Sequence, residues 1–223
     1  MRKLLMVMVV IMAVVMVAGM ASATLLGIGS LGYPDIMFNN TGTISYTAST
    51  DSFVLDADDW KIAYADGTSD YLTGTEYMTD IKIYLTVDNN GNLVGTGTMV
   101  EKVVEGSVTV SGNTYSAGTI LLSGTVVAFG WGEGDNLDDF DFLISKDSLS
   151  GALVDDGIWP TTWPTGIVAY AEDIGGWTGS WNSDFKLSKV KGDKAPVPEP
   201  ATLLLLGSGL IGLAGIGRKR LKR

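Results

Sequence analysis

Alternation of apolar and polar residues marks the middle of the chain and predicts β-strands. Residues 81–87 alternate strictly, which places four apolar side chains on one face of a strand. Asn90-Gly91 follows shortly after, and this dipeptide is the strongest short signal for a hairpin turn. We therefore expect residues 93–104 to return as an antiparallel partner strand.

Further strands are predicted on both sides of this hairpin. Residues 107–110 and a strand beginning near Thr114 suggest a second hairpin, and residues 119–131 are apolar almost throughout, as in a strand buried on both faces. Weaker alternation predicts strands at residues 43–50, 60–65, 139–145, 167–171 and 185–190. Since no segment of this region keeps a helical period over three turns, we predict an all-β fold, an antiparallel β-sandwich or jelly roll.

Residues 1–23 have the pattern of a secretory signal peptide. A basic start precedes a long apolar run, and Ala21 and Ala23 place small residues before a cleavage position at Thr24. The Sec translocon and signal peptidase are the partners that this pattern predicts. The apolar run is long for a signal peptide, so an uncleaved N-terminal anchor is the alternative.

The last 26 residues consist of three parts in a fixed order. Pro198-Glu199-Pro200 comes first, an uncharged apolar segment at residues 201–217 follows, and residues 218–223 form a basic end. At about 1.5 Å per residue the apolar segment would span roughly 25 Å as a helix, slightly less than a bilayer core of about 30 Å. We expect a single transmembrane helix with the basic end in the cytoplasm. The basic residues are Arg218, Lys219, Arg220, Lys222 and Arg223.

These three parts resemble a PEP-CTERM sorting signal, the C-terminal element of a class of exported bacterial proteins. The resemblance implies recognition by an exosortase, a membrane-embedded processing enzyme, with cleavage near Pro198-Glu199-Pro200. It also implies a Gram-negative-type bacterium whose exported proteins accompany exopolysaccharide. The resemblance covers only residues 197–223, so it indicates where the protein goes and not what the rest of the chain does.

The chain is thus expected to contain one exported domain between its two targeting segments. We predict a signal peptide at residues 1–23, a β-rich domain at 24–190, a short linker at 191–197 and the sorting signal at 198–223. The linker is inferred from its Lys, Gly and Pro residues. One domain of this length is within the usual size range.

Composition narrows the chemistry of the exported domain. Eight Lys and no Arg stand against 24 acidic residues at positions 24–197, a net charge of −16, which disfavours nucleic acid as a partner. The chain has no Cys and no His, which excludes disulfides, Ser-His-Asp and Cys-His catalytic sites and His metal sites. Metal binding would therefore have to use oxygen ligands.

An acidic stretch offers such ligands for calcium. Glu133, Asp135, Asn136, Asp138 and Asp139 supply several hard oxygens, although their spacing does not match an EF-hand loop. The competing interpretation is a solvated loop leading into a strand whose Asp side chains face outward and whose Phe side chains face inward. We favour the loop, so no cofactor is predicted, and calcium stays a hypothesis.

Four Trp residues form two pairs with the same spacing. Trp159 with Trp163 and Trp177 with Trp181 would each lie on one face of a strand, as flat platforms on which sugar rings stack. Prolines next to the first pair disfavour a regular strand there. We favour packing in the core of the domain, and a protein interface is the third interpretation.

Paired carboxylates for glycoside hydrolysis are a further hypothesis. Such an enzyme needs two acids about 5 to 10 Å apart across a cleft, for which Glu133 with Glu172 or Asp173 is an example. With so many acidic residues some pair always looks suitable, and no other signature supports a hydrolase.

We therefore expect a non-enzymatic exported protein of the envelope or extracellular matrix, associated with exopolysaccharide or biofilm. The alternative is a secreted carbohydrate-binding or glycoside hydrolase-like protein of the same compartment. The expected partners are the exosortase, the membrane and extracellular polysaccharide. Nucleic acid is not an expected partner.

Overall fold

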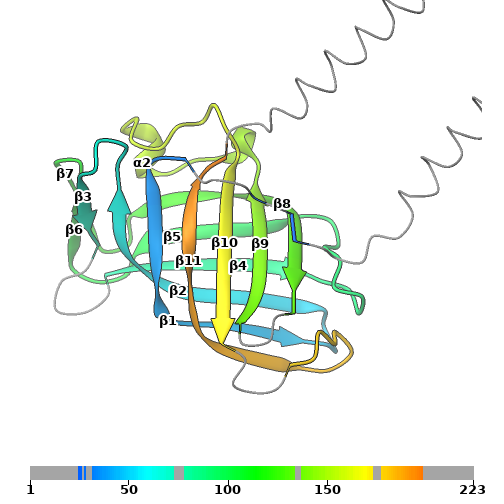
Figure 1. The fold of residues 1–223 in the computed structure, drawn as a ribbon. Coiled ribbons are helices and arrows are strands. Elements are labelled where there is room, and N and C mark those ends of the chain that lie inside the picture. The colour runs from blue at the N-terminus through cyan, green and yellow to red at the C-terminus, as the bar shows by residue number, and fades with distance from the viewer. Residues whose placement is uncertain are drawn as a thin grey trace, which may run out of the picture.

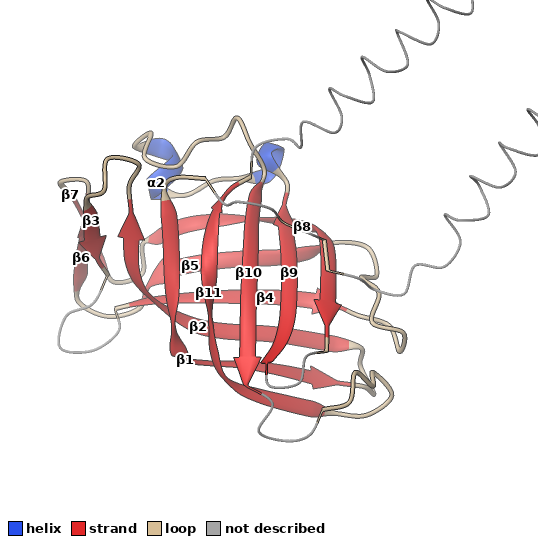
Figure 2. Ribbon diagram, viewed as in Figure 1, coloured by secondary structure: helices blue, strands red, loops and turns tan. Residues whose placement is uncertain are grey.

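Most of the chain that the computed structural model describes is in β-strands, and the rest is mainly loops and turns (Figure 2). The described residues are 25–26, 28, 32–72, 78–133, 137–172 and 177–197. The strands are β1 (Asp35–Thr47), β2 (Ser52–Ala63), β3 (Ser69–Tyr71), β4 (Thr79–Thr86), β5 (Gly97–Val103), β6 (Ser107–Val110), β7 (Asn113–Ser116), β8 (Ile120–Gly132), β9 (Leu137–Ile144), β10 (Thr165–Glu172) and β11 (Phe185–Pro196). Two helical turns, η1 (Lys146–Ser148) and α2 (Ala152–Asp155), lie between β9 and β10.

Eight of these strands form one antiparallel sheet that closes on itself (Figure 1). Their order is β1-β11-β10-β9-β8-β5-β4-β2, and β2 also pairs with β1. The short strand β3 extends the sheet from the end of β2, while β6 and β7 form a separate hairpin. The chain therefore winds up and down around a closed, barrel-like sheet, with β3 and the β6–β7 hairpin as insertions.

The sequence predicts an all-β fold, which the structure confirms, but the prediction of a sandwich or jelly roll was wrong. Strand β1 pairs along its length with both β2 and β11, and this joins the two edges of the sheet into one layer. Alternation within a strand identifies its buried face. It does not indicate whether that face packs against a second sheet or against the far side of the same sheet.

The two predicted hairpins are present, but the burial predicted for the strand that follows them was wrong. Strands β4 and β5 pair across the turn near Gly91, and β6 pairs with β7. The apolar run predicted at residues 119–131 is β8, but it is not buried on both faces, since Ile120 and Val127 are 46% and 45% exposed. In a single closed layer the outer face of every strand meets solvent unless an insertion covers it.

The last strand includes residues that the sequence analysis assigned to a linker. β11 continues to Pro196 and pairs with β1 on one side and β10 on the other. Gly192 is needed there because a Cβ atom would overlap the Phe38 ring and a backbone carbonyl of β10. Beyond the strand, the backbone N–H group of Val197 donates a hydrogen bond to the Pro164 carbonyl oxygen at 2.8 Å. The linker prediction for residues 191–196 was therefore wrong. Lys191 and Asp193 alternate with the inward-facing Gly192 and Lys194, as in a strand.

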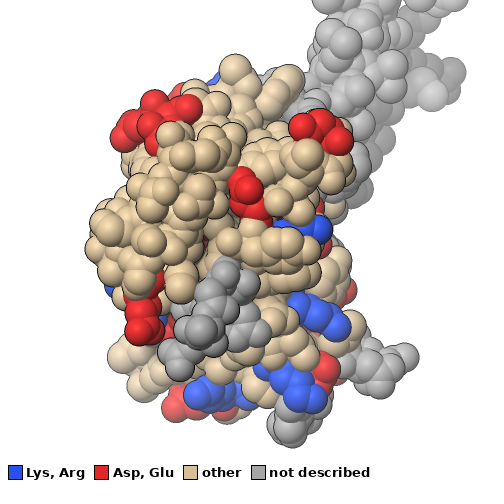
Figure 3. Space-filling view, turned by 90° about the vertical axis from the view of Figure 1, so that its left-hand side faces the viewer, with Lys and Arg blue, Asp and Glu red and all other residues tan. Residues whose placement is uncertain are grey.

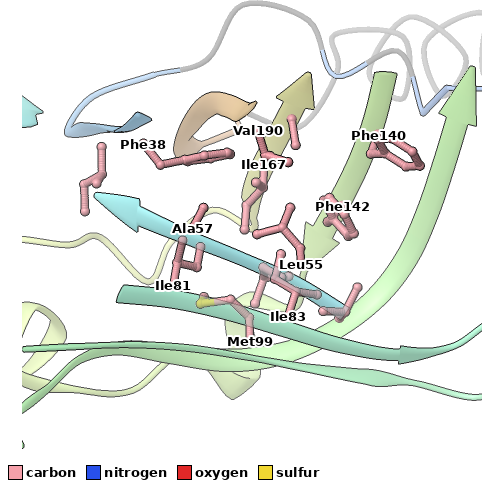
Figure 4. Close-up of a cluster of buried hydrophobic side chains, with 14 of the residues drawn as sticks. Phe38, Leu55, Ala57, Ile81, Ile83, Met99, Phe140, Phe142, Ile167 and Val190 are labelled. Atoms are coloured by element: carbon pink, nitrogen blue, oxygen red, sulfur yellow. The ribbon is translucent and has the colours of Figure 1, made fainter. Parts of the chain in front are cut away.

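Inward side chains fill the interior of the closed sheet. Figure 4 shows apolar side chains from β1, β2, β4, β5, β9, β10 and β11 pointing toward one another. At the end where β1 ends and β11 begins, aromatic rings pack edge to face and in offset stacks. We call these rings the aromatic cluster: Tyr46, Phe53, Phe129, Trp131, Phe140, Phe142, Trp177, Trp181 and Phe185.

Candidate functional site

The acidic stretch does not converge on one point within the residues that the structure describes. Asp138 and Asp139 are neighbours in β9 and point to opposite sides of it, with Asp138 fully buried. Glu133 is exposed, while Asp135 and Asn136 lie outside the described residues. Among described side chains no group of three or more acidic residues is gathered to hold a metal ion. Calcium binding by this loop stays a prediction.

The following strand has the orientation expected from the competing interpretation. Phe140 and Phe142 are fully buried in the interior, where they join the aromatic cluster. Asp139 and Asp141 occupy the alternate positions of β9, but Asp141 is only 4% exposed, so the expectation that it is solvated was wrong. The prediction that the Phe side chains face inward is confirmed.

The four Trp residues do not form flat, exposed platforms. Trp159, Trp177 and Trp181 are 1%, 7% and 2% exposed, and only Trp163, at 39%, has a substantial surface. The rings of Trp177 and Trp181 are perpendicular, with centroids 5.4 Å apart. Trp159 donates its indole N–H to Thr165 Oγ1 at 2.9 Å. The stacking geometry proposed for these pairs was therefore wrong, because both pairs contain rings that pack in the core.

The carboxylates considered for hydrolysis are in different settings. Glu172 forms a surface ion pair with Lys189 at 2.6 Å. Glu133 is exposed, and Asp173 lies outside the described residues. These observations do not decide whether the protein hydrolyses glycosides, and that hypothesis stays a prediction.

The structure brings together three charged side chains that the sequence analysis did not single out. Lys194 of β11, Asp59 of β2 and Glu101 of β5 meet inside the closed sheet, and none of the three side chains is exposed at all. Lys194 Nζ lies 2.6 Å from Glu101 Oε2 and 3.3 Å from Asp59 Oδ1. Because the three strands are not neighbours in the sheet, the contacts cross its interior. We call these residues the buried ion cluster.

Electrostatics favour one additional proton in the buried ion cluster. Fully ionised, the cluster has a net charge of −1, which is costly in a medium without water. Burial, first of all, and then the charge of Glu101 raise the pKa of Asp59 well above its ordinary range, against the opposing effect of Lys194. Burial alone would lower the pKa of Lys194, but the two carboxylates outweigh it and raise that pKa. Protonated Asp59 leaves the cluster neutral.

Two oxygen atoms of the cluster accept no hydrogen bond from the described residues. These are Asp59 Oδ2 and Glu101 Oε1, both fully buried. A proton on Asp59 gives one carboxyl group a donor for the other, and the side-chain hydrogen bond between them is a further cause of the raised pKa of Asp59. The three groups are thus close enough to exchange protons without solvent.

Two carboxyl groups, the partly buried Asp35 and the buried Asp80, should make folding stability depend on pH. Burial is the main cause that raises the pKa of both Asp35 and Asp80 to about 6. Since an unfolded Asp titrates near 3.9, the folded chain binds more protons between these values. The free energy of unfolding should therefore be highest near pH 4 and fall, by about 1–3 kcal/mol, as the pH rises to about 6. Urea unfolding followed by Trp fluorescence at several pH values measures this.

Matched variants test which groups cause this pH dependence. Asp80→Asn should flatten the fall between pH 4 and 6. Asp66→Asn should leave it unchanged, because hydrogen bonds from Thr68 lower the pKa of Asp66 and move its titration below this range. A stability that rises with pH from 4 to 6 would contradict the raised values.

The two targeting segments lie outside the described residues. These include the cleavage-site residues Ala21, Ala23 and Thr24, the Pro198-Glu199-Pro200 motif and the predicted transmembrane helix. No helix within the described part of the chain is long and apolar enough to cross a membrane. Val197, the last described residue, follows directly after β11.

Comparison with protein-family models finds the PEP-CTERM protein-sorting motif at residues 196–220. No curated protein and no solved structure matches the chain. The motif begins at Pro196, the last residue of β11, so it adjoins the closed sheet directly. This motif indicates export, anchoring at the cell envelope and processing by an exosortase. The chain therefore carries a PEP-CTERM protein-sorting motif, which is joined directly to an all-β domain.

Proposed function

We propose that this protein is a non-enzymatic component of the cell envelope or extracellular matrix. It is held in the membrane by its C-terminal segment, with the basic end in the cytoplasm, until an exosortase processes it. The observation that carries the proposal is the sorting motif at residues 196–220. The packed interior of the closed sheet supports a structural role, because its inward side chains contact one another across the sheet.

Association with exopolysaccharide or biofilm is part of this proposal. It is supported by the setting that the sorting motif implies and by the chemistry of the surface. The net charge of −16 at residues 24–197 disfavours strongly acidic polymers, so a neutral polysaccharide fits better. Figure 3 shows one face, on which acidic groups stand apart from one another and most basic side chains gather toward the lower part.

Peptide mapping of both termini tests the processing. The native protein is purified separately from membranes and from culture supernatant, in a host with its exosortase and in one from which the exosortase is deleted. We expect an N-terminus at Thr24 and a C-terminus near Pro198 in the first host, and a chain ending at Arg223 in the second. The replacement of Pro198, Glu199 and Pro200 by Ala should reproduce the deletion.

Two outcomes would overturn parts of the proposal. A chain that ends at Arg223 in the membranes of the exosortase-containing host would indicate a permanent anchor without processing. Reducing-sugar release from a matrix polysaccharide, abolished by replacing a single Asp or Glu, would replace the structural role with a hydrolase. A structural binder should instead be retarded in affinity electrophoresis on the polysaccharide without releasing sugar.

A further inference from the structure

The buried ion cluster places an amine beside a carboxyl group with a second carboxyl group in contact. Lys194 Nζ is 3.3 Å from Asp59 Oδ1, which sets the nitrogen next to the carboxyl group that it would attack. Glu101 Oε2 is 2.6 Å from the same nitrogen, a short and therefore strong hydrogen bond along which a proton can move. Reacting groups held in contact at about 3–3.5 Å are positioned for reaction without further loss of freedom.

The surroundings of the cluster exclude water. On the inward face, Asp59 lies opposite Phe38 of β1, Glu101 opposite Ile81 of β4, and Lys194 opposite Ile167 of β10. These three neighbours are labelled in Figure 4, within the apolar interior. In water an amine and a carboxylic acid do not condense to an amide, because both groups are ionised and because bulk water favours hydrolysis. A dry site disfavours the ionised form of Asp59, the acid that the nitrogen attacks, and lets the water that is formed leave the equilibrium.

From this geometry we propose that the folded protein forms an intramolecular isopeptide bond between Lys194 Nζ and Asp59 Cγ, with Glu101 as the catalytic proton carrier. The cluster starts as an ammonium, a protonated Asp59 and an ionised Glu101. Glu101 takes one proton from Nζ, and the free electron pair of the nitrogen then attacks Asp59 Cγ to form the C–N bond.

The remaining protons and atoms balance without another reagent. Glu101 passes its proton to the departing hydroxyl group of Asp59, the C–O bond breaks, and one water molecule leaves. The second proton lost by the nitrogen moves to Glu101, which ends protonated and neutral in the interior. No electron is gained or lost. The products are an amide between β2 and β11, one water and the acid form of Glu101.

The position of this bond in the chain gives it a role at the envelope. It would join residues 135 positions apart, in the second and the last strand of the domain. β11 continues directly into the sorting motif, so a pull on the C-terminal anchor acts first on this strand. A covalent link from Lys194 to β2 would transmit this force directly to β2, so that the hydrogen bonds of β11 would not have to resist it alone.

Mass spectrometry of the full chain tests the bond. After both termini have been mapped, the wild-type protein should be lighter than its sequence by the mass of one water. Proteolysis should yield a branched peptide in which Lys194 is joined to Asp59. Lys194→Met and Glu101→Gln should each have the full sequence mass, whereas Lys189→Met, which removes the surface ion pair on the same strand, should still lack one water.

The wild-type measurement is decisive even if a variant fails to fold. Folded wild-type protein with its full sequence mass, and with Asp59 and Lys194 in separate peptides, would overturn the proposal. Loss of water located at any other pair of residues would overturn it as well. A folded Glu101→Gln variant that still forms the branched peptide would overturn the role of Glu101.

Discussion

Replacing Lys194 by Met should lower the free energy of unfolding by about 3–5 kcal/mol, because it leaves two buried carboxyl groups without their cation. The Lys194 side chain has no exposed surface, and neither do its partners Asp59 and Glu101. The loss is expected whether the nitrogen is held by ion pairs or by the proposed amide. Urea unfolding of the purified protein, followed by Trp fluorescence, measures it.

A surface pair on the same strand is a matched control. Lys189 lies 2.6 Å from Glu172, the same distance as Lys194 from Glu101, but its side chain is 50% exposed. Lys189→Met should therefore cost less than about 1 kcal/mol. Equal losses for the two variants would contradict the argument from burial.

Replacing the whole buried ion cluster separates its charge from its volume. A variant with Asp59→Leu, Glu101→Leu and Lys194→Met has apolar side chains of similar size and no buried charge. It should be more stable than Lys194→Met, because it leaves no buried carboxyl group without a cation, and buried ion pairs are often no more stabilising than apolar contacts. A triple variant less stable than Lys194→Met would indicate that the carboxyl groups stabilise the fold in another way.

Part of this cluster was open to prediction from the sequence. Asp59 follows Phe53, Leu55 and Ala57 at every second position, so the alternation of β2 already places it on the inward face. Glu101 likewise stands between the inward Met99 and Val103 of β5. A charged residue in an inward register is a signal of a buried partner, in addition to the strand that the alternation predicts.

Lys194 and the closure of the sheet were harder to predict. Lys194 stands in a run of Lys, Gly and Asp that has the composition of a linker, and the register of β11 shifts where it passes Lys189, which adopts a positive φ of 54°. Strand β1 pairs with β11 across almost the whole length of the domain. Local patterns contain no information on such a distant pairing, so the strands could be predicted while the closed sheet was not.

Replacing Phe53 by Ala should also lower the free energy of unfolding by about 3–5 kcal/mol, since a large ring is removed from a packed interior. Phe53 has no exposed surface, and its ring centroid lies 5.2 to 6.1 Å from those of Phe129, Phe140, Phe142 and Trp181. These neighbours come from strands β8 and β9 and from the segment before β11, so they cannot all move to fill the space. Urea unfolding of the variant and the wild type measures the difference.

Tyr84 is the matched control for Phe53, because it is an aromatic residue on the neighbouring strand β4 that points outward and is 47% exposed. Tyr84→Ala should change the free energy of unfolding by less than about 1 kcal/mol. A large difference between the two variants would support a solid interior, as the proposed structural role requires. If Phe53→Ala cost no more than Tyr84→Ala, the aromatic cluster would contribute little to stability. Its rings would then be better explained as the lining of a ligand site, and the structural role would lose its support from the packed interior.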